Sequence, residues 1–152
     1  MKYLLFLALL TPTANARMGE TLAECEARYG KGKKVGERVE FAKGDIAITV
    51  HFGKDENCDY IFFTAYKVLS RRPFTDDECG GLLKANGLGH ILVRRESIEG
   101  GEIEWQAGSK QVAAVMVGNS SRIVFFTPQG KKALDAHLEA ESKKEPESIK
   151  GF

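Results

Sequence analysis

Apolar and polar residues alternate along several short stretches of the chain, a pattern that predicts antiparallel β-strands with one buried face. The clearest stretch is residues 45–52, DIAITVHF, in which every second residue is a large apolar one. Residues 110–117, KQVAAVMV, form a more uniformly apolar counterpart. An acidic residue beside an aromatic one marks a further strand before each stretch, at residues 39–41 and 103–105. We interpret HILVRRES, within residues 88–101, as an added edge strand.

Two segments begin with the same helix signature. Thr21 precedes Glu24 by three residues in GETLAECEARYG, and Thr75 precedes Glu78 by three in FTDDECGGLLKANG. This spacing predicts a capping box, in which the threonine oxygen accepts from a helical N–H and the glutamate reaches back to the N-cap. We therefore expect two short helices. A third is expected from about Lys131, with a narrow apolar stripe typical of a helix on the surface or against a partner.

The order helix, strand, turn, strand, loop, strand occurs twice along the chain. The last strand of each series carries nearly the same tetrapeptide, IFFT at residues 61–64 and VFFT at residues 124–127. Ordered repetition of this kind predicts a duplicated unit. We therefore predict an α+β fold in which two tandem helix-plus-antiparallel-sheet repeats form one sheet with helices on one face, plus a C-terminal helix. The expected parts are a signal peptide (1–16), repeat unit 1 (17–70), repeat unit 2 (71–130), and a C-terminal helix with a charged tail (131–152).

Residues 1–16 have the features of a secretory signal: one lysine, an apolar run and a small-x-small ending, Ala14-Asn15-Ala16. The alternative is a buried N-terminal strand. We expect export, with a periplasmic or extracellular location. Removing this segment takes away Lys2 alone among the charged residues and leaves 21 basic and 21 acidic ones. That balance argues against nucleic acid as a partner and against a polybasic membrane anchor. No second long apolar segment follows, so we expect no membrane insertion after signal removal.

The chain of 152 residues has three cysteines, Cys25, Cys58 and Cys79. An oxidising compartment favours at most one disulfide, and we expect it to join Cys58 with Cys25 or with Cys79. Three buried, inert thiols are the alternative. The sequence has none of the common catalytic or phosphate-binding motifs and no metal-ligand spacing, so we expect no cofactor and no catalytic residue.

Aromatic residues are concentrated on the predicted strands. Because neighbouring strand residues point to opposite faces, the two phenylalanines of each FFT cannot both face the helices. Either an aromatic row is exposed for a partner, or the C-terminal helix or the other repeat covers it. The candidate binding residues are Phe41, His51, Tyr60, Phe62, Tyr66, Trp105 and Phe125.

This arrangement resembles the tandem-repeat fold of the β-lactamase inhibitor proteins. Its first helix is also similar to that of the small lipoprotein of the outer-membrane β-barrel assembly machine. The resemblance implies protein binding through the open face of the sheet and the hairpin loops, with Tyr60, Trp105 and the loop 54–59 at the interface. The residues that carry it are Gly19, Thr21, Glu24, Tyr29, Gly30, Thr75 and Glu78.

Together these patterns favour an exported, non-enzymatic module that binds another protein or envelope component. One alternative is a small envelope hydrolase whose site is assembled from distant residues, with His51, Cys58 and Glu40 as its candidate members. The other is a structural accessory that caps an envelope assembly through its C-terminal helix. A pocket that joins a histidine to a carboxylate or a cysteine would favour the hydrolase.

Overall fold

A computed structural model describes residues 17–68, 70–96, 102–117 and 119–143, so the predicted signal at residues 1–16 lies outside the described residues. The described residues form three helices and nine strands, and the predicted α+β class is confirmed. The helices are α1 (Leu22–Tyr29), α2 (Asp76–Asn86) and α3 (Pro128–Ser142). The strands are β1 (Lys33–Val35), β2 (Arg38–Lys43), β3 (Ile46–Phe52), β4 (Cys58–Lys67), β5 (Ser70–Arg71), β6 (Leu92–Glu96), β7 (Ile103–Ala107), β8 (Ala113–Val117) and β9 (Arg122–Phe126).

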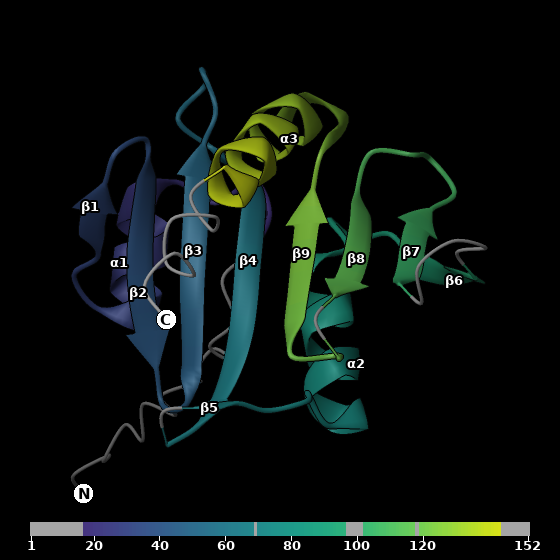
Figure 1. The fold of residues 1–152 in the computed structure, drawn as a ribbon. Coiled ribbons are helices and arrows are strands. Elements are labelled where there is room, and N and C mark those ends of the chain that lie inside the picture. Colours follow the sequence, from purple (N-terminus) through teal and green to yellow (C-terminus); the bar gives the residue numbers. More distant parts are fainter. Residues whose placement is uncertain (1–16, 69, 97–101, 118, 144–152) are drawn as a thin grey trace, which may run out of the picture.

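All nine strands belong to one antiparallel sheet, with the order β1-β2-β3-β4-β9-β8-β7-β6 and with β5 paired to the end of β4 (Figure 1). The two halves of this order run outward from the central β4–β9 pair. Each half consists of a helix followed by a four-stranded meander, and β6 is the edge strand predicted within residues 88–101. The strand order is the one expected for two repeats, whereas duplication as the origin of the two halves stays a prediction.

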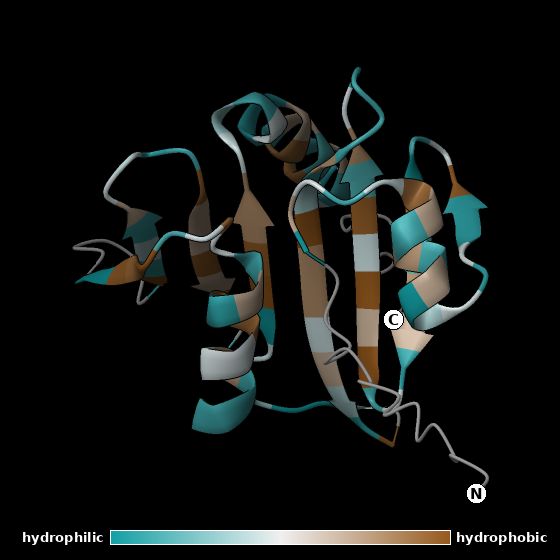
Figure 2. Cartoon of the chain, turned by 180° about the vertical axis from the view of Figure 1, so that it is seen from behind, coloured by the Kyte–Doolittle hydropathy of each residue, from teal (hydrophilic) through white to brown (hydrophobic). Residues whose placement is uncertain are grey.

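Helices α1 and α2 cover one face of the sheet (Figure 2). Both begin with the predicted capping box: the Thr21 hydroxyl accepts from the Glu24 backbone N–H at 3.4 Å, and that of Thr75 from Glu78 at 3.2 Å. The buried side chains beneath the two helices form the main core of the protein. Its members include Cys25, Phe41, Ile48, Val50, Phe63, Leu82, Trp105, Ile123 and Phe125.

Helix α3 covers part of the opposite face, where it crosses the upper ends of the central strands in Figure 1. It begins at Pro128 and not near Lys131, because Thr127 serves as its N-cap and accepts from the Gly130 N–H at 3.0 Å. Proline suits the first helical position, where its missing N–H has no partner to lose. Leu134 packs against Tyr60, Phe62 and Val124 to form a second, smaller core.

The two FFT segments do not occupy equivalent positions in the sheet. Phe63 and Phe125 lie in the main core, where their ring centroids are 6.0 Å apart, whereas Phe62 and Phe126 face α3. The sequence match pairs Phe62 with Phe125, and these two residues point to opposite faces. The predicted residue-by-residue correspondence is therefore wrong here, because a shift of one residue along a strand reverses the face of every side chain.

All three cysteines are free thiols, so the predicted disulfide between Cys58 and Cys25 or Cys79 does not form in this structure. Cys25 and Cys58 are both buried in the main core. Burial raises the pKa of Cys25 to about 12 and that of Cys58 well above its usual range. The reactive thiolate form of both residues is therefore disfavoured.

Candidate functional site

Most of the predicted binding residues are buried, so the expectation of an exposed aromatic row is wrong. Phe41, Trp105 and Phe125 lie in the main core. Tyr60 and Phe62 are 1% and 3% exposed because the smaller core with α3 covers them. The covering element is the C-terminal helix, one of the two alternatives that the sequence left open. His51 and Tyr66 are only partly buried, and each of them lines a cavity.

The first cavity, here called the Arg122 groove, has a volume of about 550 Å³ and lies beside the C-terminal part of α3. Its floor and walls come from β2, β3, β4, β5, β9 and α3. Most of its lining is polar, because it occupies the part of the sheet that α3 leaves uncovered. The lining residues are Glu40, Phe41, Ala47, Ile48, Thr49, Thr64, Tyr66, Arg71, Arg122 and Glu141.

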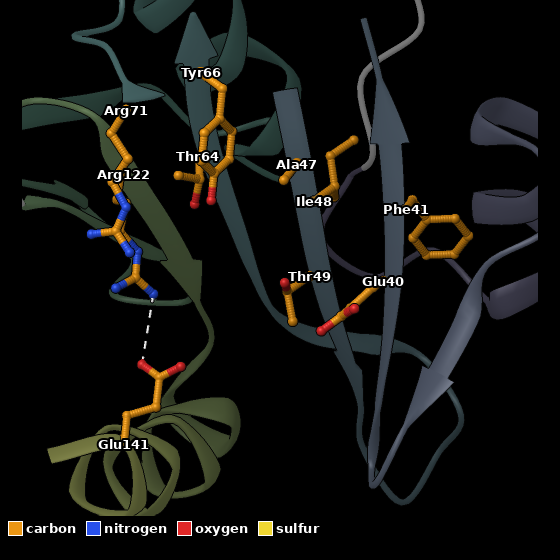
Figure 3. A pocket seen from close by; sticks show the side chains of 10 residues that line it. All are labelled: Glu40, Phe41, Ala47, Ile48, Thr49, Thr64, Tyr66, Arg71, Arg122 and Glu141. Carbon is orange, nitrogen blue, oxygen red and sulfur yellow. Dashed lines mark ion pairs between the residues drawn. The ribbon is translucent and has the colours of Figure 1, made fainter. Parts of the chain in front are cut away.

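The Arg122 groove has two arginines and Glu141 on one side and a second carboxylate, that of Glu40, on the opposite wall. Figure 3 shows Arg71 and Arg122 together on one side and Glu40 on the other, with the hydroxyl groups of Thr64 and Tyr66 between them. The uncovered face can therefore contact a ligand through guanidinium, hydroxyl and carboxylate groups at once. It offers no broad apolar surface of the kind predicted from the aromatic strands.

Arg122 is held in the groove mainly by packing. Its guanidinium carbon lies 4.8 Å from the centroid of the Phe62 ring, a cation–π arrangement. Its side chain is 20% exposed, and the buried Nε has no hydrogen-bond partner. The carboxylate of Glu141 is 3.9 Å from Nη2, which makes a loose ion pair beyond hydrogen-bonding distance.

A second cavity of about 300 Å³, here called the histidine pocket, lies between the β1–β2 turn and α3 and is lined by His51, Tyr60 and His137 among others. The Nδ1 atom of His51 is 2.6 Å from the Asp59 carboxylate. Its ring stacks on Tyr60 with 4.8 Å between the centroids. Burial raises the pKa of Tyr60 to about 12, so this residue acts here as a neutral packing surface.

Helix α3 closes the histidine pocket through His137. Its Nε2 lies 2.5 Å from Arg38 Nη1 and 3.4 Å from a carboxylate oxygen of Glu141. Glu141 also lines the Arg122 groove, so α3 contributes to both cavities from residues one helical turn apart. Among the residues that the structure describes, no group of three or more His, Cys, Asp and Glu side chains is placed to hold a metal ion.

The three residues proposed for a hydrolase do not come together. His51 lines the histidine pocket and Glu40 the Arg122 groove, whereas Cys58 belongs to the same buried core as Cys25. The carboxylate that pairs with His51 is instead Asp59, in the residue after Cys58.

Sequence reasoning missed Arg71, Arg122 and Glu141 as parts of a cavity. One signal was present, because Ala47, Thr49 and His51 alternate with apolar residues and so mark a polar face of β3. The partners of that face come from β9 and α3, and no local pattern in the sequence points to them.

Comparisons with known proteins add little to this picture. No protein-family model matches the chain, and no curated protein matches it. Among solved structures, a DUF4309 family protein, YjgB, from Bacillus subtilis is similar at 14% sequence identity, with a TM-score of 0.39. The match covers 70% of this chain and 78% of that one. Across the described residues, no helix is both long and apolar enough to cross a membrane.

Proposed function

We propose that this protein is an exported, non-enzymatic binding module that holds a segment of another protein or envelope component in the Arg122 groove. The observation that carries the proposal is the groove itself, an open cavity of about 550 Å³ on a part of the sheet that α3 leaves uncovered. Concave sites with a few convergent polar groups are the usual places for ligands. The resemblance to β-lactamase inhibitor proteins also supports binding through the open face of the sheet.

A groove-filling variant tests this proposal. Thr49 lies on the wall of the groove, and Thr49→Trp places a bulky ring in the space that the partner needs. The matched control is Val93→Trp on β6, at the far edge of the sheet, where the side chain is already 59% exposed. Both variants and the unaltered protein are immobilised and exposed to an envelope extract of the source organism, and bound proteins are quantified.

We expect Thr49→Trp to lose most of a partner that Val93→Trp and the unaltered protein retain equally. Thermal unfolding of each variant establishes that Thr49→Trp is folded at the assay temperature. A partner that binds all three proteins equally would exclude the groove as the binding site.

Export rests on the charged start, apolar run and small-x-small ending of residues 1–16. Expression in a bacterial host followed by N-terminal sequencing of the released product tests it. The expected first residue is Arg17. A product that keeps Met1 and remains in the cytoplasm would refute export without bearing on the groove.

A second candidate function, hydrolysis, is favoured by one specific observation. Asp59 orients His51 at 2.6 Å inside a cavity, and an imidazole held in this way can act as a general base toward water. The test is turnover of simple carboxylate and phosphate esters by the unaltered protein and by His51→Gln. Turnover that disappears in His51→Gln would favour the hydrolase over the binding module.

A further inference from the structure

The guanidinium group of Arg122 lacks the hydrogen bonds that its burial calls for. Among the described residues it has no hydrogen-bond partner, and its Nε is fully enclosed. The nearest carboxylate, that of Glu141, stays at 3.9 Å and is itself 49% exposed. Other arginines of the chain show the usual behaviour: Arg72 makes hydrogen bonds of 2.7 to 2.9 Å with Asp45 and Glu78.

A buried charged donor without an acceptor is costly, so a ligand that supplies an acceptor beside Arg122 would gain a hydrogen bond that the protein itself does not make. Arg71 also lines the groove, on the same side as Arg122, and brings a second guanidinium to that wall (Figure 3). A single guanidinium group can bind a carboxylate through two parallel N–H···O bonds, and a second one nearby adds further donors. The hydroxyl groups of Thr64 and Tyr66 are further donors beside them.

We propose that Arg122 and Arg71 bind a carboxylate, and that Glu40 on the opposite wall binds a cation carried by the same ligand. This inference deepens the proposed function, because it names the chemistry of the segment that the groove holds. The occupant is a peptide segment of the partner with an acidic side chain at the arginine wall and a basic one near Glu40.

The charges of the groove favour such a zwitterionic ligand over a simple anion. The two arginines are balanced by Glu40 and Glu141, so the lining is neutral as a whole and gives a doubly charged anion no net attraction. A ligand with one charge of each sign can instead form favourable pairs at both walls. Glu40 on β2 and Arg122 on β9 are separated by three strand spacings, roughly 14 Å between their strands. The side chains of Glu40 and Arg122 both extend into the groove, so the distance between their charged groups is shorter than this. A ligand with a short carbon chain between its two charges can span it.

Two small probes of equal chain length test the proposal. Hexanoate carries a carboxylate alone, and 6-aminohexanoate carries the same carboxylate with a terminal ammonium group. Each is titrated into the whole protein at constant ionic strength, and the Nε–Hε signal of Arg122 is followed by NMR after assignment by its loss in Arg122→Gln. Inorganic phosphate serves as the doubly charged comparison.

We expect saturable shifts of the Arg122 signal with both carboxylates, tighter binding of 6-aminohexanoate than of hexanoate, and the weakest binding for phosphate. Arg71→Gln should weaken the binding of both carboxylates by about tenfold, which corresponds to the loss of one charged hydrogen bond of about 1.4 kcal/mol. Glu40→Gln should lower the affinity for 6-aminohexanoate to that for hexanoate and leave the affinity for hexanoate unchanged, because hexanoate has no ammonium group to pair with Glu40. The control Arg94→Gln, on the exposed edge strand β6, should leave all three affinities unchanged.

Absence of a saturable shift with either carboxylate would overturn the proposal, and so would tighter binding of phosphate. Equal binding of the two carboxylates would overturn the role of Glu40. These failures are distinct from a failure of the proposed function. If no carboxylate binds but Thr49→Trp loses the partner, the proposed function holds and the carboxylate inference fails. If carboxylates bind but Thr49→Trp retains the partner, the groove is not the site at which the partner binds.

Discussion

The two faces of the single sheet differ in how they are covered and in what they contain. The face beneath α1 and α2 is almost wholly apolar, with side chains such as Val50, Ile123 and Phe125 fully buried. The face beneath α3 holds a small apolar core around Leu134 and then becomes polar, with two cavities beside the helix. Two helices enclose a continuous core, whereas one helix with a narrow apolar stripe covers only what lies directly under it.

Under the proposed function, this difference places most of the stability on one face and the binding site on the other. The apolar face provides most of the hydrophobic stabilisation, because burial of apolar area is the main favourable contribution to folding. The α3 face keeps charged and hydroxyl side chains accessible on rigid strands, which is the arrangement that a specific ligand site needs. The variants below test this separation, from the largest expected effect to the smallest.

Phe62 and Phe63 are neighbours on β4 and lie on opposite faces of the sheet, so substituting each in turn compares the two faces directly. Phe63→Ala removes a ring from the main core, and we expect a loss of about 3–5 kcal/mol in the free energy of unfolding. Phe62→Ala removes the same ring from the smaller core, where α3 can settle into the space, so we expect a loss at least about 1 kcal/mol smaller. Urea denaturation measures both. Equal losses would show that the two cores are energetically alike.

Gly130 determines how closely α3 approaches the sheet. A Cβ atom at this position would overlap the backbone carbonyl group of Asp59, so Gly130→Ala forces the start of the helix away from β4. Overpacking of this kind costs about 1–3 kcal/mol. We expect faster amide hydrogen exchange in α3, with little change in α1 and α2. The control is Lys132→Ala, on the exposed side of α3, and accelerated exchange throughout the sheet would contradict the independence of the two faces.

Capping threonines start the helices on both faces and should contribute equally. Thr75 caps α2 on the apolar face, and Thr127 caps α3 on the other. Replacing either by alanine removes the N-cap hydrogen bond that its hydroxyl accepts and also the bond that it donates, from Thr75 to the Glu78 carboxylate and from Thr127 to the Asp59 carbonyl. We expect each variant to lose about 1 kcal/mol of stability. Chemical denaturation measures the free energy of unfolding of both variants. A much larger loss in one of them would mean that its threonine anchors the helix to the sheet as well as capping it.

The smallest expected effect concerns how the stability of the protein depends on pH through Glu78, at the start of α2 on the apolar face. The hydrogen bond from Arg72 lowers the pKa of Glu78 from 4.5 to about 2, with further lowering by Thr75. A carboxylate whose pKa is lower in the folded state stabilises the protein above its unfolded pKa and loses this contribution as the pH falls toward its folded pKa. We therefore expect stability to decrease between about pH 4.5 and 2, and to decrease less in Glu78→Gln, as measured by thermal unfolding across that range.

The features that the sequence predicted correctly are local ones. The capping boxes at Thr21 and Thr75 rest on a spacing of three residues, and the strand at 45–52 rests on a period of two. Because these patterns depend on neighbours along the chain, the α+β class and the main helices could be inferred from them. The third helix was placed a few residues late, since Thr127 was assigned to the end of the preceding strand and was not recognised as a helix cap.

The site could not be inferred in the same way. Alternation in IFFT requires one phenylalanine on each face, but it does not say which, and the repetition as VFFT suggested a correspondence that the register contradicts. Only the pairing of β4 with β9 decided that Phe63 and Phe125 share the core. Only the docking of α3 decided that Tyr60 and Phe62 are covered, because its narrow stripe is compatible with several surfaces.

By itself, then, the sequence determined the three helices and the longer strands, though not the short strands β1 and β5. It also determined that neighbouring residues of a strand face opposite sides, since backbone geometry and side-chain spacing act over a few residues. The tertiary structure decided which face is a continuous core and which carries the Arg122 groove. The Arg122 groove joins Glu40 of β2, Arg122 of β9 and Glu141 of α3, residues far apart in the chain. Their proximity follows from strand order and helix docking, which depend on the packing of the whole sheet.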